Sequence, residues 1–158
     1  MDLPNLVFVT GKGGVGKTTV TRLLGRMSQK EGHRTAIIEV NGETQLRQSL
    51  GLTHPLFGPH PIDSNLDLFC LNAIDCLQDF GKQKLRSKRL VKMLLGHRVI
   101  ETLIDGMPGL HDLFQLGKIH HLLTDNGNEE PYERIFIDTP SSGHAQTLFS
   151  AAASIRDM

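Results

Sequence analysis

Four short, largely apolar runs recur along the chain and predict strands. The runs are residues 6–9, 35–38, 66–71 and 135–138. The first is continuous rather than alternating, which is typical of a strand buried on both faces. Apolar residues at helical spacing fill most of the intervals between the runs. Alternating strands and helices predict an α/β fold, a mostly parallel sheet flanked by helices in a three-layer α/β/α arrangement.

The first helix is predicted to follow the first strand closely. Val20, Leu23, Leu24 and Met27 recur at i, i+3, i+4 and i+7, the spacing of one apolar helix face. Gly32 is placed to end this helix. A strand–helix–strand crossover of this length predicts that the first two strands form a parallel, right-handed pair.

The middle of the chain predicts a loop and then helices. A short helix is expected at 43–50, and residues 51–63 hold three prolines among glycines, which predicts a loop. Residues 75–126 predict a helical insertion that Pro108 and Gly109 interrupt. Its candidate buried residues are Leu77, Phe80, Leu90 and Leu94, and its second helix should present a face of Leu110, Leu113, Phe114, Gly117 and His121. A last helix is expected at 145–158.

Seven basic residues lie between positions 82 and 98 of this insertion. Either they form a solvated helix face, or they contact an anionic partner or a membrane surface. The sequence does not decide between these two interpretations.

A phosphate-binding motif links the first strand to the first helix. Residues 11–18 fit G-x-x-x-x-G-K-[ST], and their strand–loop–helix setting predicts a P-loop NTPase domain over residues 1–158. Glycines let backbone N–H groups curl around a phosphate, and the helix start adds free N–H groups. The predicted nucleotide-binding residues of this loop are Gly11, Lys12, Gly13, Gly14, Val15, Gly16, Lys17, Thr18 and Thr19. Lys17 should reach the β- and γ-phosphates, and the Thr18 hydroxyl should bind Mg²⁺.

A second cluster of candidate residues follows the last predicted strand. Asp138 ends that strand, where Mg²⁺-nucleotide sites place a carboxylate that holds a metal-bound water. Gly143, five residues later, can present its N–H to a γ-phosphate and move when that phosphate leaves. The metal ligands predicted are therefore Thr18 and Asp138.

Composition narrows the classes of function. Lys+Arg and Asp+Glu both total 17, so the formal net charge is zero and nucleic-acid binding is not expected. Two cysteines are too few for a zinc knuckle. The N-terminus lacks a basic-then-apolar signal, and no stretch approaches 18 apolar residues. We expect a cytoplasmic protein, with peripheral membrane association as an alternative.

The first loop resembles the deviant phosphate loop of dimeric ATPases in the run Gly-Lys-Gly-Gly-Val-Gly-Lys-Thr-Thr. That group includes arsenical-pump, tail-anchored-protein-targeting, septum-site and plasmid-partition ATPases and the nitrogenase iron protein. The resemblance implies that Lys12 reaches the nucleotide of a facing subunit, so that a homodimer forms across the nucleotide. It also implies ATP and Mg²⁺ as cofactors, with GTP not excluded.

The segment Asp-Thr-Pro-Ser-Ser-Gly-His at 138–144 resembles the second switch of the arsenical-pump, anion-transporting ATPase family. In that family an Asp-Pro-Ala usually orients the attacking water, whereas this chain has Asn41-Gly42-Glu43. Asn41 can hydrogen-bond a water but cannot take its proton as a carboxylate can. Glu39 and Glu43 are candidate substitutes. The family's arsenite-binding cysteines have no counterpart, which disfavours arsenite pumping.

These features predict a Mg²⁺-dependent, dimeric ATP-hydrolysing switch with Lys12, Lys17 and Asn41 as catalytic residues. The alternatives are a nucleotide-gated scaffold with weak or no hydrolysis, and a carrier for a protein client or a membrane-associated partner. A small-molecule kinase is disfavoured because residues 51–64 contain no Arg or Lys for a lid. The resemblance also predicts further strands, so we expect a portion of a chain near twice this length.

Overall fold

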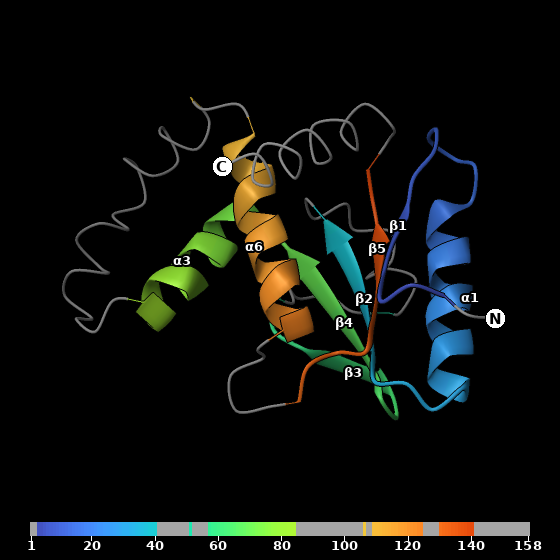
Figure 1. Cartoon of the computed structure of the whole chain (residues 1–158). Coiled ribbons are helices and arrows are strands. Elements are labelled where there is room, and N and C mark those ends of the chain that lie inside the picture. The colour runs from blue at the N-terminus through green and yellow to red at the C-terminus, as the bar shows by residue number, and fades with distance from the viewer. Residues whose placement is uncertain are drawn as a thin grey trace.

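The computed structural model describes residues 3–40, 51, 57–84, 106, 109–124 and 130–140 (Figure 1). Several predictions lie outside these residues. They include the helices at 43–50 and 145–158, most of the basic segment at 82–98, and the candidate residues Asn41, Glu43 and Gly143.

Five strands form one mixed sheet in the order β1-β5-β2-β4-β3. They are β1 Leu6–Val9, β2 Thr35–Val40, β3 His60–Asp63, β4 Leu66–Leu71 and β5 Arg134–Asp138. The first, second, fourth and fifth run parallel, and β3 pairs antiparallel with β4. The mostly parallel α/β sheet is therefore confirmed, and so are all four predicted strands.

Two predictions about the sheet are wrong. Residues 60–63 form strand β3 rather than loop, because a proline is tolerated on an edge strand, and the pairing with β4 shifts between Pro61 and Asp63. Strands β1 and β2 are parallel but are not neighbours, since β5 lies between them. Strand β5 comes about 100 residues after β2 in the sequence, so the residues around the first crossover give no indication that it lies between β1 and β2.

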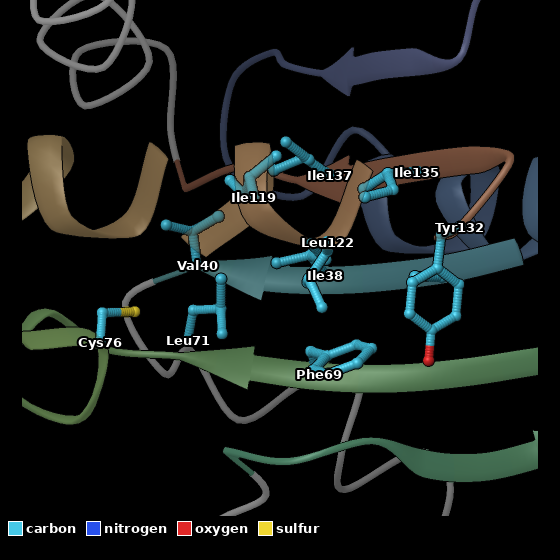
Figure 2. Packing of buried hydrophobic residues seen from close by; sticks show 11 residues of the cluster. Ile38, Val40, Phe69, Leu71, Cys76, Ile119, Leu122, Tyr132, Ile135 and Ile137 are labelled. Atoms are coloured by element: carbon cyan, nitrogen blue, oxygen red, sulfur yellow. The ribbon is translucent and has the colours of Figure 1, made fainter. Parts of the chain in front are cut away.

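Helices cover both faces of the sheet (Figure 1). Helix α1, Lys17–Lys30, packs mainly on β5 and β2, while α3, Ala73–Lys84, and α6, Leu110–Thr124, pack on each other on the opposite side. Figure 2 shows Ile119 and Leu122 of α6 meeting Ile38, Phe69 and Ile137 of the sheet. This face holds the larger part of the core. No described helix is long and apolar enough to cross a membrane.

Helix α1 packs on the sheet through small residues instead of its apolar face. Thr21, Gly25 and Ser28 are buried, whereas the side chains of the predicted apolar face point largely to solvent. A Cβ added at Gly25 would lie 2.7 Å from Ile37 Cδ1, so the helix approaches β2 too closely for a larger side chain. The periodicity predicted the helix correctly but not the face that contacts the sheet.

The helices of the insertion also differ from the prediction. Phe80 of α3 is exposed, whereas Leu77 is partly buried against the core as predicted. In α6 the fully buried residues are Asp112, Gln115, Ile119 and Leu122, while Leu110 and Phe114 of the predicted face are partly buried against the core. Leu113, on the predicted face, is more than a third exposed. Leu90 and Leu94 lie outside the described residues.

Candidate functional site

The loop at residues 10–16 leaves the carboxyl end of β1 and enters α1 at Lys17. Gly14 and Gly16 have φ values of 77° and 91°, in the left-handed region that glycine adopts without strain. Gly11 is limited by space, because an added Cβ would lie 3.2 Å from Val15 Cγ2. The loop therefore depends on its glycines for two different reasons, backbone conformation and close packing.

The first turn of α1 presents backbone N–H groups toward this loop. The N-cap residue is Gly16, and no side chain caps this end of the helix among the described residues. The first helical hydrogen bond runs from the Val20 N–H to the Gly16 carbonyl, at 3.0 Å. The N–H groups of the preceding helical residues have no acceptor within the helix, so they and the helix dipole favour an anion here.

The two lysines of the loop have different surroundings. The Lys17 ammonium donates a hydrogen bond to the Lys12 carbonyl, with Nζ 3.2 Å from the oxygen, and so folds back over the loop. The Lys12 side chain is exposed. One cation is thus held within the loop while the other extends from it.

A hydrogen bond joins the start of α1 to the end of β5. Thr18 Oγ1 donates to Asp138 Oδ2 at 2.6 Å, although the residues are 120 positions apart. Thr139 fixes the end of β5 beside β1, because both its N–H and its hydroxyl donate to the Val9 carbonyl, at 3.2 and 2.8 Å. The fold thus brings together the two residues that the sequence predicts as metal ligands.

The chemistry of this pair fits Mg²⁺. A hydroxyl and a buried carboxylate supply the hard oxygen donors that Mg²⁺ prefers, and this ion usually keeps several waters and uses one or two carboxylates. No group of three or more His, Cys, Asp or Glu residues suited to a metal occurs in the described part of the chain. Two protein oxygen donors leave the other positions around such a cation to waters and phosphate oxygens.

Glu39 adds a second buried carboxyl group beside Asp138. The two residues are register partners on adjacent parallel strands, and Glu39 is only 3% exposed. Cys70 Sγ, on the other neighbouring strand, donates to Glu39 Oε2 at 3.5 Å. An acidic residue inside an otherwise apolar strand is the sequence signal for this position. Asn41 follows two residues later and, with Gly143, lies outside the described residues.

Comparison with known proteins assigns the chain to a family. The profile of the family described as Anion-transporting ATPase matches residues 4–157. The chain belongs to the anion-transporting ATPase family. This family is the one that the loop and the segment after Asp138 resemble, and the α/β sheet has the P-loop NTPase fold expected of it.

Three curated relatives illustrate the relationship to other anion-transporting ATPases. ATPase ASNA1 homolog 2 of Paramecium tetraurelia is 27% identical over 95% of this chain and 45% of its own length. The putative arsenical pump-driving ATPase of Chlorobaculum tepidum is 27% identical over 92% of this chain and 35% of its own. The arsenical pump-driving ATPase of Escherichia coli is 23% identical over 93% and 25%. The chain thus spans less than half the length of each of these relatives.

Proposed function

We propose that this protein binds and hydrolyses ATP with Mg²⁺ and works as a homodimeric switch. The observation that carries the proposal is the 2.6 Å hydrogen bond between Thr18 and Asp138. Thr18 follows Lys17 in the first turn of α1, whose N-terminus has no side-chain cap among the described residues. It places a hydroxyl, a carboxylate and an ammonium group beside backbone N–H donors. Membership of an ATPase family supports the same chemistry.

In this proposal the loop N–H groups and Lys17 bind the β- and γ-phosphates and neutralise the charge that develops during phosphoryl transfer. A magnesium ion bound at Thr18 and Asp138 would add positive charge beside the phosphate oxygens. The carboxylate of Asp138 holds its position through the neighbouring Thr139 contacts with β1. The nucleotide-binding set is completed by Gly143.

Hydrolysis requires a group that orients the attacking water. The candidates in this chain are the amide of Asn41 and the carboxylates of Glu39 and Glu43, which lie two residues before and after it. Asn41 positions the water, while Glu39, two residues earlier in the chain, is a buried carboxyl group that is able to accept a proton. Lys12 reaches the nucleotide of the partner subunit. Release of the γ-phosphate then loosens the segments at 39–43 and 138–144 and, with them, the dimer.

Calorimetry with paired lysine variants tests the nucleotide site. Lys17→Ala should weaken ATP binding in the presence of MgCl₂ by about 10²-fold or more, because it removes a charge-assisted contact to phosphate. Lys30→Ala is the matched control, since it removes the same charge from the other end of α1. The proposal fails if the folded wild-type protein gives no binding heat with ATP or GTP plus MgCl₂.

A nucleotide-gated scaffold is the second candidate, and Asn41 favours it. An amide cannot act as a general base, so a protein that relies on Asn41 alone would bind ATP without rapid turnover. Phe80 and Leu113 expose apolar surface on the α3–α6 pair, which suits a protein client. Single-turnover hydrolysis with protein in excess separates the two functions, because the scaffold releases no phosphate.

A further inference from the structure

Three polar side chains occupy matching positions near the carboxyl ends of three adjacent strands. Glu39 of β2 is the register partner of Asp138 on β5 and of Cys70 on β4. Adjacent strands lie about 4.8 Å apart, so register partners whose side chains share a face are close neighbours. The question is therefore whether these three side chains point to the same side of the sheet.

All three side chains lie on the face of the sheet that α1 covers. Asp138 accepts its hydrogen bond from Thr18 of α1, which places it on this face. Residues i and i+2 of a strand share a face, and Ile37, two residues before Glu39, lies against α1. Cys70 belongs to the same packed cluster as Ile37. The three polar residues thus form a row that extends from the candidate metal site across β2 to β4.

Within this row the Cys70 thiol donates a hydrogen bond to the Glu39 carboxyl group. The distance from Sγ to Oε2 is 3.5 Å, and a thiol is a weak donor. Glu39 is 3% exposed and Cys70 is 8% exposed, so bulk water competes little for this bond. The bond therefore fixes the orientation of a carboxyl group that lies beside Asp138.

Cys76 shows how an ordinary core cysteine differs from Cys70. A buried free cysteine usually behaves as a small apolar residue. Cys76 fits that description, because it packs in the cluster with Ile119 and Leu122 on the opposite face of the sheet. Cys70 instead contacts a buried carboxyl group, and an apolar residue in its place would remove one hydrogen-bond donor from that group. Its position therefore indicates a role beyond packing.

We propose that Cys70 is a positioning residue of the nucleotide site. Its thiol holds the Glu39 carboxylate beside Asp138, where Glu39 accepts hydrogen bonds from water molecules of the bound Mg²⁺. The inference rests on the proposed function, because it requires a magnesium ion at Thr18 and Asp138. Mg²⁺ keeps several waters in protein sites, so a second carboxylate next to its ligand has waters to contact. Partners of this outer kind contribute about 10- to 100-fold to metal affinity.

Substitutions at position 70 separate the hydrogen bond from the packing. Cys70→Ser keeps a donor, whereas Cys70→Val keeps an apolar side chain suited to a strand and removes the donor. Cys76→Val is the matched control, because it makes the same change at the other buried cysteine, on the opposite face of the sheet. Each variant is first checked for cooperative unfolding. Cys70→Ala takes the place of Cys70→Val if the larger side chain prevents folding.

Calorimetry then measures the binding of a non-hydrolysable ATP analogue to the 158-residue chain at a series of MgCl₂ concentrations. The quantity compared is the magnesium midpoint, the Mg²⁺ concentration that gives half of the gain in affinity for the analogue. Titrations in EDTA measure binding without the metal. They should give the same affinity for all the variants, since the row contacts the waters of the ion and not the phosphates.

We expect Cys70→Val to raise the magnesium midpoint by about threefold or more, and Cys70→Ser to stay within about twofold of the wild type. Cys76→Val should leave the midpoint unchanged. Glu39→Gln should raise it ~10-fold or more. Adding Cys70→Val to Glu39→Gln should have no further effect, because the thiol acts only through that carboxylate.

Three results overturn the proposal. They are a wild-type midpoint in the folded variant that lacks the donor, an effect of that variant that persists in the Glu39→Gln background, and an equal shift in Cys76→Val, which would trace the effect to core packing. A wild-type chain whose binding of the analogue does not depend on Mg²⁺ contradicts the proposed function and this inference together. Mg²⁺-dependent binding that Cys70→Val leaves unaltered overturns this inference alone.

Discussion

At the residue scale, the two loop lysines should separate nucleotide binding from turnover. Lys17 is tied to the Lys12 carbonyl within its own loop, whereas the Lys12 side chain extends to solvent. We predict that Lys12→Ala lowers turnover by about 10³-fold, as loss of a cation supplied from a partner does, with little change in ATP affinity. Steady-state phosphate release and calorimetry on the same preparation measure the two effects. Wild-type turnover in Lys12→Ala would exclude a role across the dimer.

A second residue-scale prediction concerns Tyr132, the single tyrosine of the chain. Its hydroxyl donates to Asp67 Oδ2 at 2.6 Å, and its ring meets Phe69 edge-on and lies 4.7 Å beneath the Arg34 guanidinium. Burial, followed by the hydrogen bond to Asp67, raises the pKa of Tyr132 above its usual value. The folded state therefore favours the neutral phenol, and this stability is present below pH ~10 and is lost as the pH rises beyond it.

We accordingly predict that the free energy of unfolding declines above pH ~10, by up to about 1.4 kcal/mol per pH unit, and that Tyr132→Phe flattens the decline. Denaturant titrations at a series of pH values measure it. Tyrosinate absorbance gives an independent check, because the chain has no tryptophan. If Tyr132 ionises in the folded protein with the pKa of an exposed tyrosine, the prediction is wrong and burial does not raise that pKa.

At the element scale, close contact between α1 and β2 makes Gly25 sensitive to one added methyl group. That methyl would lie 2.7 and 2.8 Å from Ile37 Cδ1 and Cγ1. We predict that Gly25→Ala destabilises the fold by about 1–2 kcal/mol, because overpacking outweighs the gain in helix propensity. Gly117→Ala in α6 is the control, since nothing lies within 4 Å of the added Cβ, and it should stabilise by about 0.5–1 kcal/mol. Chemical denaturation of both variants compares them.

The same contact explains what the sequence can and cannot predict about the elements. Apolar runs locate β1, β2, β4 and β5 because strands buried among helices need apolar residues on both faces. The periodicity of α1 predicts a helix, but the partner of each face depends on distant residues, here Ile37 and Leu66 around Gly25. Pro61 led to the prediction of a loop where β3 forms. Antiparallel pairing at the sheet edge depends on the neighbouring strand and not on local propensity.

For the candidate site, the sequence predicts those residues that a local pattern marks. The spacing between Gly11 and Thr18 predicts the loop, and an acidic residue at the end of an apolar run predicts Asp138. The contact between Thr18 and Asp138 follows only from the insertion of β5 beside β1, which the sequence pattern does not reveal. The placement of Glu39 beside Asp138 depends on the register of β2 with β5 for the same reason.

At the scale of the whole molecule, the proposed chemistry and the exposed apolar side chains of α1 lie on different surfaces. The phosphate loop, Asp138 and Glu39 lie at the carboxyl ends of the parallel strands, while helix α1 runs along the flank of the molecule (Figure 1). A homodimer built across two nucleotides would be isologous and would form through the first surface only. Its formation should therefore depend on nucleotide and not on Leu23.

We predict that the protein is monomeric without nucleotide and dimeric with Mg²⁺ and a non-hydrolysable ATP analogue. Lys12→Ala should weaken this dimer, because an exposed cation no longer neutralises the phosphates of the facing subunit. Leu23→Glu should leave it intact, since that exposed side chain lies about two turns along α1 from the loop. Sedimentation velocity over a range of protein concentrations measures both variants against the wild type. A nucleotide-dependent dimer that Leu23→Glu disrupts and Lys12→Ala preserves would place the subunit interface on α1, and Lys12 would then act within its own subunit.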